Sequence, residues 1–297
     1  VWDEVPGNLL VETFFGDTEA TARAFAGAHR VIERTFVIPR VTACALEPRA
    51  ALAHHDVQSG RSTLWAGSGG AVRQKAELAT VLGIDPKGLR VLSLDVGGNF
   101  GSRNRTFVEF GLVLWAARLL GRPVKYTASR SEAFLTDYQG RDLVSTVSLA
   151  LDADGRFLAL KADNLSNVGA RCASLSPLSK GSGLITGSYD IPAATLRSRA
   201  VFTNTMPTTP YRSSGRPEVT YAIERLIDVA ADELGIDLGD ARLEAQPVLD
   251  LAEGRSGAPF TDAELARVRD IALNSYRQQM KNPEALIQQI SGLIAAG

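Results

Sequence analysis

Residues 89–120, LRVLSLDVGGNFGSRNRTFVEFGLVLWAARLL, decide the class of fold. The apolar stretch from Leu89 to Asp95 predicts a strand, and the helical spacing from Thr106 to Leu120 predicts a helix that ends before Gly121. Between them lies a glycine-rich loop, residues 97–103. A strand that runs through such a loop into a helix is typical of folds in which helices pack on sheets.

Outward from this unit, other segments add both kinds of element. Leu143–Leu151 and Phe157–Leu165 alternate polar and apolar residues around the turn Asp152–Gly155, which predicts an antiparallel hairpin. A helix is predicted to begin at Pro217 and to end at Gly235, with an apolar face that carries Val219, Ala222, Ile223, Leu226, Ile227 and Ala230. Residues 44–53 are expected as a strand and 169–192 as irregular chain. We therefore expect an α+β fold with mixed sheets and packed helices.

The composition excludes several classes of protein. Of 297 residues, 45% are hydrophobic and 22% charged, which is typical of a globular chain. The net charge of −1 gives no positive field that would attract nucleic acid or anionic lipid. Apolar stretches stop well short of the roughly 18 residues that span a bilayer. We expect no nucleic-acid partner, no membrane association and a cytoplasmic location, although a periplasmic one stays compatible.

The two ends of the chain differ in character from its middle. The chain opens on Val1 rather than on methionine, so we expect the interior of a longer polypeptide. Residues 1–242 are expected to form one domain, and residues 243–260 a linker. A capping box, Thr261 to Glu264, opens a predicted C-terminal helical hairpin over residues 261–297.

The glycine-rich loop has two interpretations. Backbone N–H groups in such a loop can bind a phosphate or another polyanion, and Arg103 and Arg105 favour this interpretation. The loop matches neither the dinucleotide-binding fingerprint nor the P-loop. The other interpretation is a tight turn that packs a strand against a helix.

Two further segments carry polar groups. Residues 206–218 include two arginines and two hydroxyls before a helix, which suits planar oxyanions, although an ordinary capped helix start would look the same. Glu47-Pro48-Arg49 is expected within a strand, as a buried ion pair or as a functional carboxylate.

Several of these segments, in this order, match one family. They are residues 47–51 (EPRAA), 95–101 (DVGGNFG) and 211–218 (YRSSGRPE), followed by 221–225 (YAIER). Together they resemble the molybdopterin-binding subunit of the xanthine dehydrogenase and aldehyde oxidase family, which includes the large subunit of aerobic carbon monoxide dehydrogenase. The resemblance covers residues 1–242.

The resemblance implies a molybdenum-cofactor-binding domain of an oxidoreductase, with no residue bound directly to the metal. By resemblance, Arg212 is the catalytic residue, which orients the substrate oxygen. The implied cofactor contacts are Gly97, Gly98, Asn99, Phe100, Gly101, Arg212 and Ser213. The implied substrate pocket is lined by Asn104, Ser213 and Ser214.

Departures from the family pattern reduce the range of expected substrates. The family commonly has a glutamine beside the metal where Gly69 stands, so one hydrogen bond to the metal centre is missing. Ser213 replaces the copper-binding cysteine of the carbon monoxide enzymes, and Ser214 and Asn104 replace the residues typical of purine oxidation. The resemblance then favours hydroxylation of an aldehyde or an N-heterocycle, with oxygen derived from water.

The family's catalytic glutamate has no counterpart after Arg242. We therefore expect a partner chain or segment that carries it, and iron-sulfur and FAD groups on partner chains. The cofactor is expected in its cytosine dinucleotide form if the chain is bacterial. One alternative is a non-catalytic remnant or assembly module; a weaker one is a binder of phosphate ligands that uses the glycine-rich loop alone.

Overall fold

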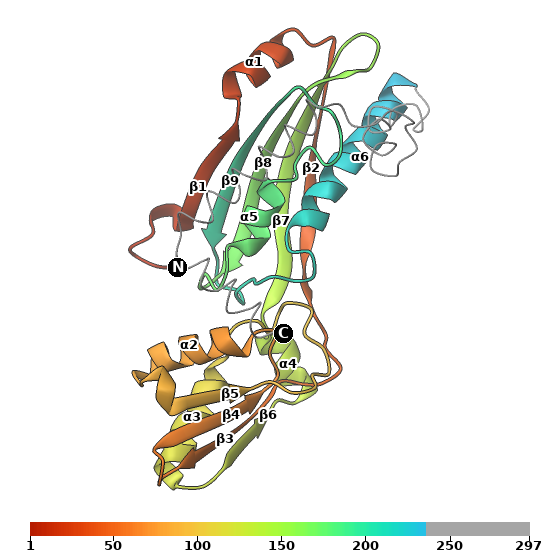
Figure 1. The fold of residues 1–297 in the computed structure, drawn as a ribbon. Helices are drawn as coiled ribbons and strands as arrows, with labels where there is room; N and C mark the ends of the chain where they lie inside the picture. The colour runs from red at the N-terminus through yellow and green to blue at the C-terminus, as the bar shows by residue number, and fades with distance from the viewer. Residues whose placement is uncertain (236–297) are drawn as a thin grey trace, which may run out of the picture. The chain divides into compact units, whose positions relative to one another are not determined.

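The computed structural model describes residues 1–235. The predicted linker, 243–260, and helical hairpin, 261–297, lie outside these residues. The described chain forms two sheets with helices packed on them, so the α+β prediction is confirmed (Figure 1). No helix in the described part of the chain is long and apolar enough to cross a membrane.

The larger sheet has five strands in the order β1-β9-β8-β7-β2. Only β8 and β9 are parallel; the other neighbours are antiparallel. The predicted hairpin is β7 with β8, in which Leu149 faces Leu160. The strands are β1 (Leu9–Gly16), β2 (Arg30–Thr42), β7 (Gln139–Leu151), β8 (Phe157–Gly169) and β9 (Ala193–Phe202).

Three helices of the described chain contact this sheet. They are α1 (Thr18–Ala26), α5 (Ser176–Ser182) and α6 (Arg216–Leu234). Helix α1 packs on β8 and β9, and α6 packs on β2 and β7 (Figure 1). The apolar face predicted for α6 is buried as expected; its members are Val219, Ala222, Ile223, Leu226, Ile227 and Ala230.

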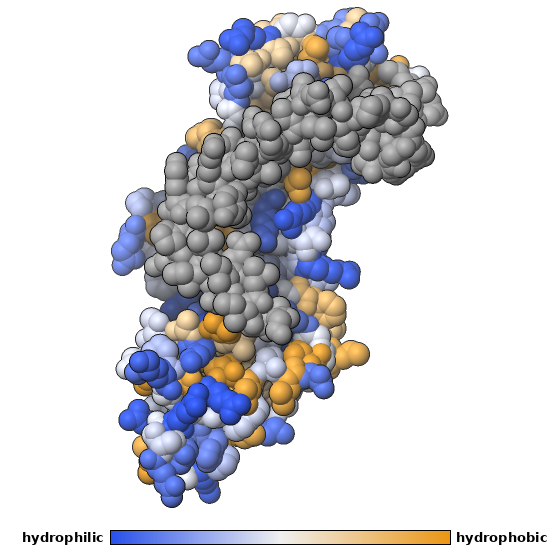
Figure 2. All heavy atoms as spheres, in the orientation of Figure 1, coloured by the Kyte–Doolittle hydropathy of each residue, from blue (hydrophilic) through white to orange (hydrophobic). Residues whose placement is uncertain are grey.

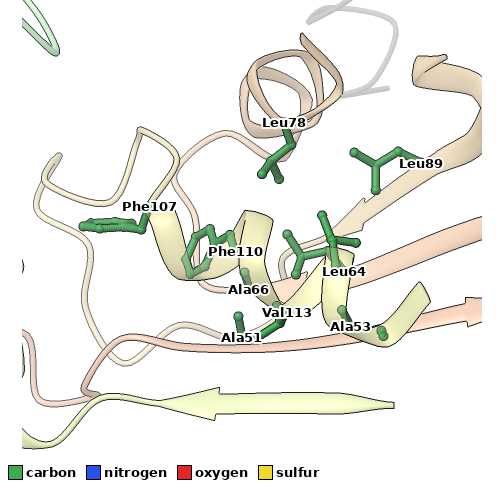
Figure 3. Packing of buried hydrophobic residues seen from close by; sticks show 11 residues of the cluster. Ala51, Ala53, Leu64, Ala66, Leu78, Leu89, Phe107, Phe110 and Val113 are labelled. Atoms are coloured by element: carbon green, nitrogen blue, oxygen red, sulfur yellow. The ribbon is translucent and has the colours of Figure 1, made fainter. Parts of the chain in front are cut away.

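The smaller sheet has the order β5-β4-β3-β6 and its own core. Its strands are β3 (Ala50–Asp56), β4 (Arg61–Ala66), β5 (Leu89–Leu92) and β6 (Val124–Thr127). Helices α2 (Ala71–Leu82) and α3 (Val108–Leu120) pack against this sheet. Leu64, Leu78 and Phe110 meet between the sheet and these helices (Figure 3). Hydrophobic residues also gather on the visible surface of this part of the molecule (Figure 2).

The remaining elements are short: 3₁₀ turns η1 (Pro6–Asn8) and η2 (Pro86–Gly88), and helix α4 (Arg130–Thr136). Two predictions were wrong here. The strand expected over 44–53 begins only at Ala50, because Cys44 has a left-handed backbone (φ 46°) and Arg49 turns its side chain into an ion-pair cluster. The stretch 169–192 is not wholly irregular, since it contains α5.

Candidate functional site

The glycine-rich loop follows β5 and holds a left-handed backbone at several positions. Gly98, Phe100 and Gly101 have φ values of 118°, 52° and 95°. Phe100 carries a side chain, so its conformation is strained, and such strain is concentrated at functional sites. The N–H groups of Gly98 and Phe100 donate to no residue that the structure describes. The loop therefore presents free backbone donors.

The loop's glycines are also required for packing. A side-chain carbon at Gly101 would lie 2.5 Å from the Pro210 carbonyl oxygen, and one at Gly98 would lie 2.9 Å from Cβ of Ala45. The two interpretations of the loop are thus compatible, because close packing holds its backbone in place. Helix α3 begins at Val108 rather than at Thr106.

A second left-handed stretch precedes α6. Ser213, Ser214 and Gly215 have φ values of 66°, 38° and 84° in succession. A side-chain carbon at Gly215 would lie 1.8 Å from the Pro177 carbonyl oxygen, so only glycine fits there. Two strained serines side by side mark this segment as a second candidate binding element.

The structure brings these two segments together. The backbone N–H of Arg212 donates to the Phe100 carbonyl at 2.8 Å. The close approach of Gly101 to Pro210 lies beside that hydrogen bond. The sequence had predicted two oxyanion-binding loops without showing that they meet.

A third segment, at the start of β7, was missed by sequence reasoning. The Gln139 carbonyl accepts from the N–H of Thr209 at 2.8 Å, and a side-chain carbon at Gly140 would lie 2.3 Å from Cβ of Tyr211. The Arg141 guanidinium lies 5.0 Å from the Tyr211 ring. A glycine directly before Arg141 was the available signal. The start of β7 therefore packs against residues 208–212 and holds them in position.

A carboxylate and a guanidinium brace the glycine-rich loop. Glu47 Oε2 accepts from the N–H of Gly97 at 2.7 Å and from Arg103 Nη1 at 3.3 Å. Arg103 also donates to the backbone carbonyl of Glu47. The Arg103 side chain is 3% exposed, and burial lowers the pKa of its guanidinium, while Asp137 and Glu47 oppose this shift.

The brace corrects one prediction about the loop. Arg103 and Arg105 were expected to favour anion binding, but each is held by a carboxylate. Arg105 lies 2.6 Å from Glu77. Anion binding at this loop would therefore rest on backbone N–H groups, because these two guanidinium groups are already paired.

Arg49 lies in a buried ion-pair cluster, but its partners lie outside the segment Glu47-Pro48-Arg49, and Glu47 pairs with Arg103 instead. Arg49 is 1% exposed, lies 2.6 Å from Glu109 and also pairs with Asp137. Its guanidinium lies 4.4 Å from the Phe107 ring. This cluster joins α3 and α4 to the start of β3.

The space beside Gly69 is filled by two asparagines. A side-chain carbon there would lie 1.9 Å from Asn104 Oδ1 and 2.6 Å from Asn99 Nδ2. Asn99 Oδ1 accepts from the N–H of Gly101 at 2.7 Å, which fixes the amide. Asn99 Nδ2 and Thr209 Oγ1 are buried polar atoms without a hydrogen-bond partner among residues 1–235. Unpaired buried donors of this kind call for an acceptor.

The side chains of the second segment divide by exposure. Arg212 and Ser213 are exposed, and the Arg212 guanidinium lies 5.7 Å from the Tyr211 ring. Ser214 is buried, with its hydroxyl 3.2 Å from that of Ser176 in α5. Within the described chain, no three metal-binding side chains lie close enough together to hold a metal ion. The arrangement can bind an anionic group through backbone and amide donors.

Comparison with known proteins agrees with this geometry. Residues 1–245 match the model of the molybdopterin cofactor-binding domain. The chain is 34% identical over 234 residues to the gamma subunit of the 6-hydroxypseudooxynicotine dehydrogenase complex of Paenarthrobacter nicotinovorans, covering 78% of this chain and 29% of that protein. It is 33% identical over 242 residues to the carbon monoxide dehydrogenase large chain of Afipia carboxidovorans, covering 80% and 30%.

Solved structures show the same fold. A Cu,Mo carbon monoxide dehydrogenase aligns with a TM-score of 0.75 at 32% identity, over 80% of this chain and 30% of that one. Quinoline 2-oxidoreductase from Pseudomonas putida aligns with a TM-score of 0.76 at 28% identity, over 99% of this chain and 38% of that one. The chain thus spans about a third of the length of the proteins it matches.

Proposed function

The chain belongs to the family of molybdopterin cofactor-binding domains, and on this premise we propose that it supplies part of the cofactor cradle and one wall of the substrate pocket of a molybdenum hydroxylase. The observation that carries the proposal is the meeting of two strained segments at the hydrogen bond from Arg212 to Phe100. The glycine-rich loop presents free backbone N–H groups near that junction, and the second segment presents the exposed side chains of Arg212 and Ser213.

The residues present fit an anionic cofactor. The free N–H groups of Gly98 and Phe100, and the unpaired Nδ2 of Asn99, are donors that a pterin phosphate or a metal oxo group would satisfy. Gly97 and Gly101 keep that backbone in place through their contacts with Glu47 and Pro210. When bound, the molybdenum cofactor supplies a redox-active metal that activates water for oxygen transfer.

Under this proposal, Gly69 leaves room for the side chains of two asparagines beside the cofactor. The family's usual glutamine would add an amide beside the metal, and here Asn99 and Asn104 fill the space above Gly69. We assign the missing donor to the Asn99 amide, since its Nδ2 has no other acceptor among the described residues. The hydrogen bond expected from the glutamine is then supplied by the glycine-rich loop itself.

The exposed residues of the second segment face the proposed substrate. Arg212 carries a fixed positive charge and orients the oxygen of the substrate, and Ser213 contacts both cofactor and substrate. Asn104 lies on the pocket wall beside Gly69. Ser214, bound to Ser176, contributes to the wall through its position rather than as a free donor.

The proposed reaction inserts oxygen from water into a C–H bond of an aldehyde or an N-heterocycle. The carbon loses two electrons, water supplies the oxygen, and two protons are released. Iron-sulfur and FAD groups on partner chains would accept these two electrons. A glutamate on a partner chain or segment would accept one of these protons; this chain spans less than a third of the length of its curated relatives. The cytosine dinucleotide form of the cofactor is proposed for a bacterial host.

The experiment is to measure molybdenum and pterin per mole of the 297-residue chain, purified from a host that makes the cofactor. The proposal expects near-stoichiometric cofactor in folded protein. The proposed cofactor cradle would be refuted if the folded chain contained neither molybdenum nor pterin, both alone and after assembly with its partner chains. It would favour the alternative of a non-catalytic remnant or assembly module.

A further inference from the structure

Helix α3 has two apolar faces. Its inner face packs on the smaller sheet through Phe110, Val113, Leu114 and Ala117, all buried. Its outer face exposes Val108 (77%), Leu112 (55%), Trp115 (59%) and Leu119 (68%). These four residues follow a spacing of four, three and four, which is the seam spacing of helices that pack side by side.

A cavity of about 610 Å³ borders this outer stripe. It lies between α3 and α2, where Val81 and Leu82 form its opposite wall. Its polar rim includes Arg105, which is paired with Glu77, and Arg171. Arg171 is exposed and lies over the Trp2 ring at 5.4 Å, and it makes no ion pair within residues 1–235. The groove is therefore apolar with one unneutralised positive charge.

Such a helix is not typical of a free surface. Of the 13 residues of α3, only Glu109 and Arg118 are charged. A helix that is apolar on both faces is usually buried on both faces. Contiguous exposed apolar residues with a polar rim mark an interaction surface. The spacing of the stripe and the groove beside it fit an amphipathic helix laid between α2 and α3.

We propose that this groove receives a helix from the part of the same subunit that the relatives carry outside the segment matched here. The chain covers only 29% and 30% of two such relatives, so most of their subunit must pack against this part or against itself. The docked helix presents an apolar stripe to Leu112 and Trp115 and a carboxylate to Arg171. It can belong to the same polypeptide or to a separate chain.

The test is site-specific cross-linking in the organism that makes the protein. Benzoylphenylalanine is placed at Leu112, in the groove, and separately at Val72, which is 84% exposed on α2 and does not line the groove. After illumination the cross-linked peptides are identified by mass spectrometry. The inference expects a cross-link from position 112 to a sequence that aligns with the unmatched part of the relatives, and none from position 72.

Three other outcomes would overturn the inference. They are a cross-link from position 112 to the same peptide in a second copy, a cross-link to an iron-sulfur or flavin subunit, and no cross-link above the level at position 72. The cross-linking experiment does not measure cofactor content. The docking proposal can therefore fail while the proposed function holds, and the proposed function can fail while the docking proposal holds.

A substitution provides a second measurement. Trp115→Glu should weaken assembly with that segment about 30-fold, or ~2 kcal/mol at 1.4 kcal/mol per factor of ten, as expected for an aromatic residue at the centre of an interface. Trp115→Phe should keep most of the binding. Circular dichroism of each purified variant confirms that α3 still folds. Equal assembly by the Glu and Phe variants would contradict the docking surface.

Discussion

Glu47 and Arg103 form an ion pair whose two partners differ greatly in burial, and this difference predicts unequal effects of removing each one. The Arg103 side chain is 3% exposed and that of Glu47 is 39% exposed. Glu47→Met leaves a buried guanidinium without its carboxylate, which costs about 3–5 kcal/mol. Arg103→Met leaves a carboxylate that water can reach, so the loss is limited to hydrogen bonds, about 1–2 kcal/mol.

The assay is thermal unfolding of the 297-residue chain followed by circular dichroism. For a domain of this size, each kcal/mol lowers Tm by roughly 2–4 °C, so we expect losses of roughly 6–20 °C for Glu47→Met and roughly 2–8 °C for Arg103→Met. Asp154→Asn, in an exposed pair with Arg156, is the control and should change Tm little.

The double variant is the decisive case. Because Glu47→Met is costly mainly through the unpaired Arg103, adding Arg103→Met should restore part of the lost stability. Two results would refute the reasoning: an Arg103→Met variant less stable than Glu47→Met, or a double variant less stable than Glu47→Met alone. Either would show that burial does not control the energetics of the brace.

Three further predictions follow from the site. Gly101→Ala places a Cβ atom in a left-handed backbone and against the Pro210 carbonyl, two residues before Arg212, so the molybdenum content of the purified protein should fall sharply. Gly121→Ala is the control, because Gly121 also has a left-handed backbone (φ 62°) but open space around it. It should lose only about 1 kcal/mol of stability and keep its cofactor, which metal analysis checks. Arg49→Met leaves the buried Asp137 carboxylate and the half-buried Glu109 carboxylate without this partner and should cost about 3–5 kcal/mol, measured by denaturant unfolding; an unchanged midpoint would contradict the role of the cluster. Arg212→Gln, at an exposed position, should leave Tm within about 1 °C of the original and reduce turnover of the assembled enzyme; full activity would remove Arg212 from the proposed mechanism.

The sequence predicted the elements whose pattern is local. The hairpin of β7 and β8 and the buried face of α6 follow directly from periods of two and 3.6 residues. Helix α4 was not predicted, although Ser129 and Glu132 form a capping box at its start. Seven residues leave little periodicity to detect, so the cap was the only signal.

The candidate site was predicted in parts rather than as a whole. Both segments that we propose to bind anions were identified from their glycine, arginine and serine content, but their junction at Phe100 depends on pairings across the fold. The brace was missed for the same reason, since Glu47 and Arg103 are 56 residues apart in sequence. The sequence shows that Glu47 and Arg103 are charged, but it does not show that they pair with each other.

The order of strands in the larger sheet has a consequence for how the chain folds. Within the described residues, β1 pairs with β9 alone, so Leu9 of the first strand cannot pair until Val201 of the last described strand has been made. The hairpin of β7 and β8 can form early, because its contacts are local. During synthesis the first strand leaves the ribosome long before its partner exists, and its unpaired edge is open to other chains throughout that interval. Completion of this sheet is therefore a late event that depends on nearly the whole described chain.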